Sequence, residues 1–61
     1  MTFTERLYVY ATHDDGSKEF LHTFLNKTEA LKYVDKHKKV FPHRFKHYEI
    51  GNHSTDMWEV V

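Results

Sequence analysis

The sequence contains no cysteine, and it has only two glycines and one proline among its 61 residues. The absence of cysteine excludes disulfides, thiolate zinc sites and cysteine nucleophiles, and it favours a reducing, cytoplasmic location. A chain this short buries only about 60% of the surface that it exposes when unfolded. We therefore expect one small domain over residues 1–61, stabilised by apolar packing alone or together with a metal or a partner chain.

Long apolar segments are absent as well. No run approaches the roughly 20 apolar residues that are needed to cross a bilayer. The opening residues, Met1–Arg6, lack the features of a signal peptide. The sequence therefore predicts a soluble protein that makes no membrane contact.

The sequence also lacks the motifs of common enzymes. Gly16 and Gly51 are isolated, so there is no glycine-rich loop to bind a phosphate. Ser17 and Ser54 lie in expected turns, and neither stands in the Gly-x-Ser-x-Gly motif that presents a nucleophile. We expect a non-enzymatic protein without a cofactor.

Six histidines suggest a metal site, above all around His43 and His47. Zinc requires several imidazoles or carboxylates that converge on one ion. His43 and His47 would share one side only in a helix, and Pro42 together with the alternating pattern after it argues against a helix there. We therefore expect no metal site.

A β-hairpin is predicted at the start of the chain, with strands at about 3–12 and 18–25. Asp15-Gly16 between them suits a two-residue type I′ turn, in which both positions have positive φ. That turn would pair residues whose numbers sum to 31. One face would then carry Leu7, Val9, Ala11, Phe20, His22 and Phe24, which we assign to the core. The other face would carry Arg6, Tyr8, Tyr10, Leu21, Thr23 and Leu25.

A helix is predicted at about 27–41. Asn26 is placed to cap it by bonding the amide of Glu29, and Pro42 ends it by disfavouring helical geometry in Phe41. The residues expected on its apolar face are Ala30, Leu31, Tyr33, Val34, His37, Val40 and Phe41.

Two further extended segments, at about 44–50 and 56–61, flank a turn-like stretch at Gly51–Thr55. A loop of two residues and a loop of four would give different cross-strand partners. The element order predicts an α+β fold, a small ββαββ domain with one helix packed on one face of a four-stranded, mainly antiparallel sheet. No segment remains to cover the other face.

Charge is unevenly distributed along this neutral chain. Residues 27–47 contain seven basic and two acidic residues, a net charge of +5, and the remainder contains two basic and seven acidic residues, a net charge of −5. Such a dipolar molecule can orient toward a charged partner. The alternative explanation is an ordinary solvated helix face.

Two functions fit these features. The first is a small binding or regulatory protein that contacts another protein, or a second copy of itself, through the uncovered sheet face and the charged helix. Its size and composition are compatible with the inhibitory or accessory proteins of phages and mobile elements. The expected contact residues are Tyr8, Tyr10, Tyr48 and Trp58. The second is a nucleic-acid-binding module that uses Lys32, Lys36, Lys39, Arg44 and Lys46.

Overall fold

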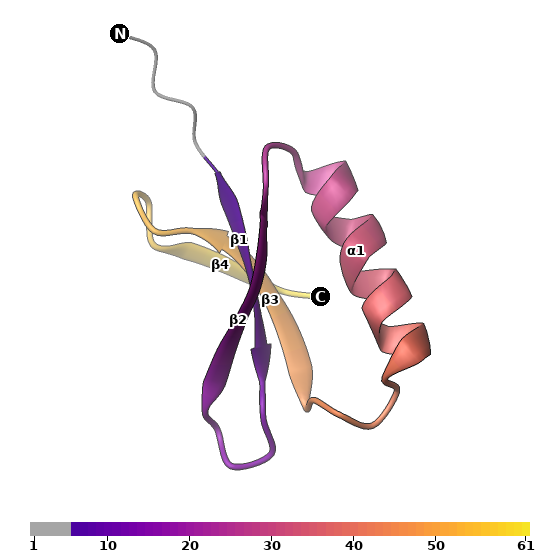
Figure 1. Ribbon diagram of the computed structural model, residues 1–61. Helices are drawn as coiled ribbons and strands as arrows, with labels where there is room; N and C mark the ends of the chain where they lie inside the picture. Colours follow the sequence, from indigo (N-terminus) through magenta and orange to yellow (C-terminus); the bar gives the residue numbers. More distant parts are fainter. Residues whose placement is uncertain (1–5) are drawn as a thin grey trace, which may run out of the picture.

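The computed structural model describes residues 6–61 (Figure 1). Its elements are β1 (Leu7–Thr12), β2 (Lys18–Phe24), α1 (Lys27–Val40), β3 (His47–Asn52) and β4 (Met57–Val60). The strand predicted at 3–12 begins at Leu7, and residues 3–5 lie outside the described part of the chain. The predicted ββαββ order is confirmed.

The four strands form one antiparallel sheet in the order β2-β1-β3-β4. The helix lies on one side of this sheet, where it contacts β1 and β2 (Figure 1). Strands β1 and β3 therefore lie at the centre of the sheet, although they come from different hairpins. The fold class predicted from the sequence is confirmed.

The first hairpin contains a β-bulge that the sequence did not predict. Pairing follows the expected register up to Val9 and His22, and the next pair is Tyr10 and Phe20. Leu21 is the extra residue, and a bulge of this kind shifts every side chain beyond it to the other face. The prediction for Phe20 and Leu21 was therefore wrong, because Phe20 lies beside Tyr10 on the face away from the helix, whereas Leu21 packs against the core.

The bulge is accompanied by a different turn. Gly16 N–H donates to the His13 carbonyl at 2.9 Å, which closes a turn around Asp14 and Asp15. Of the residues in this turn, Gly16 alone has positive φ, at 91°. The connection is therefore a three-residue loop with glycine in the left-handed position, and the predicted type I′ turn at Asp15-Gly16 was wrong.

Local signals set both ends of α1. The Asn26 side chain accepts a hydrogen bond from the Glu29 amide at 2.9 Å, as predicted. At the other end, Phe41 N–H donates to the His37 carbonyl at 2.9 Å, and Pro42 follows directly. The last helical residue is Val40, one residue before the predicted end.

Replacing Asn26 by alanine is expected to lower the free energy of unfolding by about 1 kcal/mol, since one helix amide loses its acceptor. Urea unfolding followed by circular dichroism at 222 nm measures this change. Asn26→Asp retains a capping oxygen, so its stability should stay close to that of the native chain. Equal stability of the alanine and aspartate variants would contradict the capping role.

The core lies between α1 and the sheet. It is made by Val9, Ala11, Ala30, Val34, Tyr48 and Ile50. The helix buries only a narrow part of its predicted apolar face there. Tyr33 and His37 are half-buried at the margin, whereas Leu31, Val40 and Phe41 are exposed. The two buried helix residues, Ala30 and Val34, lie one turn apart, which is the spacing of residues on one helix face.

The second hairpin has a four-residue loop. Asn52 pairs with Met57, which leaves residues 53–56 to make the turn, and Asp56 there has a φ of 52°. The strand predicted at 44–50 instead runs from His47 to Asn52, so that Gly51 is a strand residue rather than part of the turn. This placement of Gly51 determines much of the surface described below.

Candidate functional site

The sheet has one face that the helix does not cover, and we call it the outer face. Its residues are Tyr8, Tyr10, Thr12, Lys18, Phe20, Thr23, His47, Glu49, Gly51, Trp58 and Val60, joined at one end by His53 and Asp56 from the β3–β4 loop. Two of its apolar side chains are largely exposed, Phe20 at 52% and Val60 at 62%. Aromatic side chains therefore dominate a surface that is open to contact.

Gly51 allows Trp58 to lie flat across the sheet. The two residues are directly paired on β3 and β4, and a Cβ atom at position 51 would overlap the Trp58 ring. Because Gly51 has no side chain, the indole reaches over β3 and meets Tyr10 on β1, with ring centroids 5.4 Å apart. A glycine covered by an aromatic ring from the neighbouring strand is a known stabilising arrangement in sheets.

The aromatic rings of the outer face form a connected cluster. Tyr10 contacts Phe20 on one side, with centroids 5.6 Å apart, and Trp58 on the other. His53 packs against Tyr8 at 4.6 Å and against Trp58 at 5.0 Å. These are mostly edge-to-face contacts, which favour aromatic pairs beyond their buried area. Phe20 and His53 were not among the predicted contact residues, because the bulge and the loop that place them leave no clear signal in the sequence.

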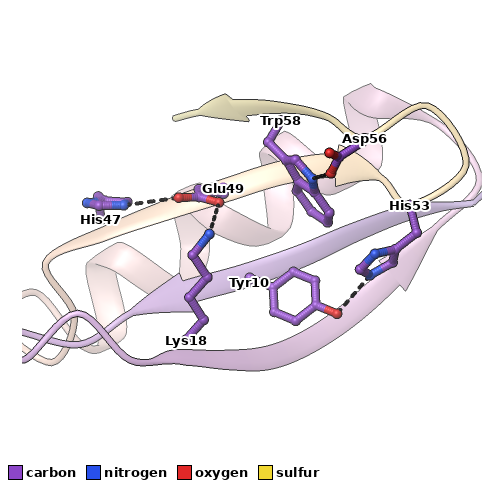
Figure 2. A network of polar contacts seen from close by, with 7 residues as sticks. All are labelled: Tyr10, Lys18, His47, Glu49, His53, Asp56 and Trp58. Carbon is purple, nitrogen blue, oxygen red and sulfur yellow. Dashed lines mark hydrogen bonds and ion pairs between the residues drawn. The ribbon is translucent and has the colours of Figure 1, made fainter.

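An ionic network borders the aromatic cluster, as Figure 2 shows. Glu49 accepts a hydrogen bond from the Lys18 ammonium group at 3.1 Å, and its second oxygen lies 3.3 Å from His47 Nε2. The Glu49 side chain is only 12% exposed. The hydrogen bond from Lys18 lowers the pKa of Glu49 below its ordinary value, with a smaller contribution from His47.

The lowered pKa of Glu49 makes the stability of the fold depend on pH. A carboxyl group with a depressed folded pKa stabilises the fold above its unfolded pKa, near 4.5, and this contribution is lost as the pH falls through the folded value. We expect Glu49→Gln to cost on the order of 1 kcal/mol at pH 7 and less at pH 3. Urea unfolding of both chains at the two pH values measures this difference. An equal cost at both pH values would contradict the prediction.

The loop end of the outer face contains a second polar group of residues. The Tyr10 hydroxyl lies 2.9 Å from His53 Nε2, and the Trp58 indole N–H donates to the Asp56 carboxylate at 3.1 Å (Figure 2). A hollow of about 190 Å³ lies among these four residues and the Lys18–Glu49 pair. We call it the outer-face pocket. Aromatic rings and two carboxylates line it together.

Tyr48 does not belong to the outer face, and its predicted position there was wrong. It is 3% exposed and lies under the helix, where its hydroxyl is 2.7 Å from His37 Nδ1. It pairs with the core residue Ala11, and the side chains of directly paired residues share a face of the sheet. Burial raises the pKa of Tyr48. Its role is therefore to join the helix to the sheet, and Trp58 is the residue of β3 and β4 that brings a large ring to the outer face.

The predicted nucleic-acid residues lie away from the outer-face rings. Lys32, Lys36 and Lys39 are exposed on the helix, where Lys39 pairs with Asp35 at 3.4 Å. Arg44 and Lys46 are exposed in the segment between α1 and β3. The Arg44 guanidinium lies over the Phe41 and Phe45 rings, 5.2 and 5.5 Å from their centroids. The sheet separates the lysines of the helix from Tyr8, Tyr10 and Trp58.

A larger hollow, of about 460 Å³, lies on the helix side of the sheet near β4. Leu7, Ile50 and Met57 provide apolar walls, and Met57 is 74% exposed. Lys27 of α1 and Glu59 of β4 form an ion pair at this hollow. The helix packs mainly on β1 and β2 and reaches β4 through this ion pair, so the rest of this side of β4 is left open.

Within residues 6–61, the side chains that commonly bind metals form no group of three or more that could hold an ion. The helix of the described region lacks the length and apolar character needed to cross a lipid bilayer.

Comparisons with protein-family models, with curated proteins and with solved structures give no significant match to this chain.

Proposed function

We propose that this chain is a non-enzymatic binding protein that contacts another protein through the outer face of its sheet. The proposal rests on the connected aromatic cluster of Tyr8, Tyr10, Phe20, His53 and Trp58, on a face that no helix or strand of residues 6–61 covers. Tryptophan and tyrosine are enriched among the residues that dominate binding energy at protein interfaces. Uncovered apolar patches on small soluble proteins commonly mark interaction sites.

The charges near the cluster favour a protein over a nucleic acid. The ionisable groups around the outer-face pocket include two carboxylates, Glu49 and Asp56, and one ammonium group, Lys18. Stacking of bases on protein rings is accompanied by a positive groove that follows the phosphates. Here the lysines of the helix lie behind the sheet, so they cannot bind the backbone of a strand stacked on Tyr10 or Trp58.

We further propose a regulatory or accessory role, in which the chain acts by occupying a surface of its partner. A second copy of this chain is the alternative partner, since a shared outer face would add core to a domain of 61 residues. The nucleic-acid-binding module remains the second function to be tested. It would use Lys32, Lys36, Lys39, Arg44 and Lys46 on the helix side.

The test uses the double variant Phe20→Ser/Val60→Ser. Both side chains are more than half exposed, so their removal changes the outer face with little effect on the core. The matched control is Leu31→Ser, which removes a 40% exposed apolar side chain from the helix. Each chain is immobilised for affinity capture from a lysate of its host and is also examined alone by sedimentation velocity.

We expect a specific captured protein, or a dimer of the chain, that the control retains and the double variant loses. The proposal would be overturned if the double variant still captures the protein and the Leu31→Ser chain does not. Labelled DNA and RNA are titrated at two salt concentrations in parallel. Salt-sensitive binding that is lost on replacing Lys32, Lys36 and Lys39 would favour the nucleic-acid module instead.

A further inference from the structure

The outer-face pocket has the chemistry of a receptor for one basic side chain. Resting on the proposed function, we infer that the partner protein inserts an arginine side chain into the pocket, against the corner formed by Tyr10 and Trp58 and toward Asp56. The inference combines three properties of the pocket, which are its uncompensated charge, its aromatic walls and its size.

The charge of the pocket is negative because only one of its two carboxylates is paired with a cation. Glu49 is paired with Lys18, and its other oxygen faces His47. Among the described residues, Asp56 has no ion-pair partner, and its side chain accepts one hydrogen bond, from the neutral Trp58 indole. A cationic group that enters the pocket therefore meets the Asp56 charge, whereas a phosphate or carboxylate would be repelled by it.

A hydrogen bond from Trp58 holds the Asp56 carboxylate in place. The φ of Asp56, at 52°, lies in the left-handed region, which aspartate and asparagine tolerate better than most residues. The indole N–H of Trp58 fixes one carboxylate oxygen at 3.1 Å, which leaves the second oxygen for another donor. A guanidinium group offers five N–H donors and binds carboxylates well.

The aromatic walls suit the flat face of a guanidinium group. Tyr10 and Trp58 are both half-buried, and their rings meet at 69°, so that they form a corner of the pocket. The ring plane of His53, which neighbours both, is close to perpendicular to the other two ring planes, at 89° to Tyr10 and 75° to Trp58. Cations bind the faces of tryptophan and tyrosine rings, and arginine does so more often than lysine.

The size of the pocket suits one side chain better than a free ligand. Sites for free small-molecule ligands commonly enclose roughly 300–1,000 Å³. The outer-face pocket measures about 190 Å³, which leaves room for a side chain supplied by a partner whose remaining surface covers Phe20 and Val60. The pocket would then provide specificity, and the surrounding apolar side chains would provide contact area.

The test titrates the intact chain with N-acetyl-arginine methylamide, and with the citrulline analogue as a neutral molecule of the same shape. Trp58 is the one tryptophan of the sequence and lines the pocket, so its fluorescence and its indole N–H resonance respond to a group that binds there. We expect saturable changes with arginine, at a dissociation constant of about 1 mM or weaker, because one side chain offers few contacts. The citrulline analogue should bind at least about fivefold more weakly.

The decisive variant is Asp56→Asn. Asparagine tolerates the left-handed backbone and retains an oxygen for the Trp58 indole, so the loop should keep its structure. We expect this variant to bind arginine about fivefold more weakly. Asp14→Asn, an exposed aspartate in the other hairpin loop, is the matched control and should bind as the native chain does.

Two results would overturn the inference, namely equal binding of arginine and citrulline, or arginine binding that Asp56→Asn leaves unchanged. The experiments also distinguish failure of the arginine inference from failure of the proposed function. If a captured partner is lost with Phe20→Ser/Val60→Ser but retained with Asp56→Asn, the outer face binds protein without an arginine in the pocket. If arginine binds in the pocket but no partner or dimer depends on Phe20 and Val60, the proposed function fails and the pocket binds a basic group of another origin.

Discussion

Replacing Ile50 by alanine is expected to lower the free energy of unfolding by roughly 3 kcal/mol, the largest effect of any single substitution considered for this chain. Ile50 is 3% exposed and pairs with Val9, which is fully buried. Natural domains are stable by only about 0.05–0.15 kcal/mol per residue. For a chain of 61 residues, this one change therefore removes a large part of the total stability.

Urea unfolding of Ile50→Ala, followed by circular dichroism and by Trp58 fluorescence, measures this loss. The matched control is Ile50→Val, which removes a single methylene group and should cost about 1 kcal/mol. A loss below 1 kcal/mol for the alanine variant would show that Ile50 is not part of a packed core.

Gly51→Ala is expected to lower the free energy of unfolding by about 2 kcal/mol. Strand propensity alone would predict no loss, because alanine is at least as favourable in strands as glycine. The new methyl group would overlap the Trp58 ring and approach the Met57 carbonyl oxygen. The indole then has to leave its position beside Tyr10, so its emission should move to longer wavelength. Urea unfolding and the fluorescence spectrum measure the two effects.

The clash is tested further in a chain that already carries Trp58→Ala. There the cost of Gly51→Ala should be smaller, because the overlap with the indole ring is removed and the contact with the Met57 carbonyl oxygen remains. Native stability and unchanged emission in the single variant would contradict the arrangement of Trp58 over Gly51. Since Trp58 also lines the outer-face pocket, Gly51→Ala should weaken arginine binding as well.

The helix was predictable because its signals are local. Asn26 caps the amide of Glu29 and Pro42 follows the last turn, so a few neighbouring residues determine where the helix lies. The element order was predictable for the same reason, since each strand is a short run of β-branched and aromatic residues between turn residues. One helix cannot cover both faces of a sheet, and this placed Tyr8 and Tyr10 correctly on the uncovered side.

The composition of the outer face was less predictable, because it depends on register. The bulge between Val9 and Tyr10 exchanges the faces on which Phe20 and Leu21 lie. A one-residue shift of register moves side chains from one face to the other without any change in the sequence, so the sequence pattern does not reveal it. The same limit applies to the second hairpin. The pairing of Tyr48 with Ala11, a residue far away in the sequence, places Tyr48 under the helix.

The central pairing of β1 with β3 also affects how quickly the fold forms. Tyr8 pairs with Gly51 and Thr12 pairs with His47, so these contacts join residues that are separated by most of the chain. Folding rates fall as contacts become more distant in sequence, because the intervening segment must be ordered before the contact stabilises it. On the ribosome, β1, β2 and α1 are synthesised before β3. The edge of β1 that pairs with β3 therefore stays unpaired until β3 has been made. The sheet is therefore completed late in the folding of each newly made chain.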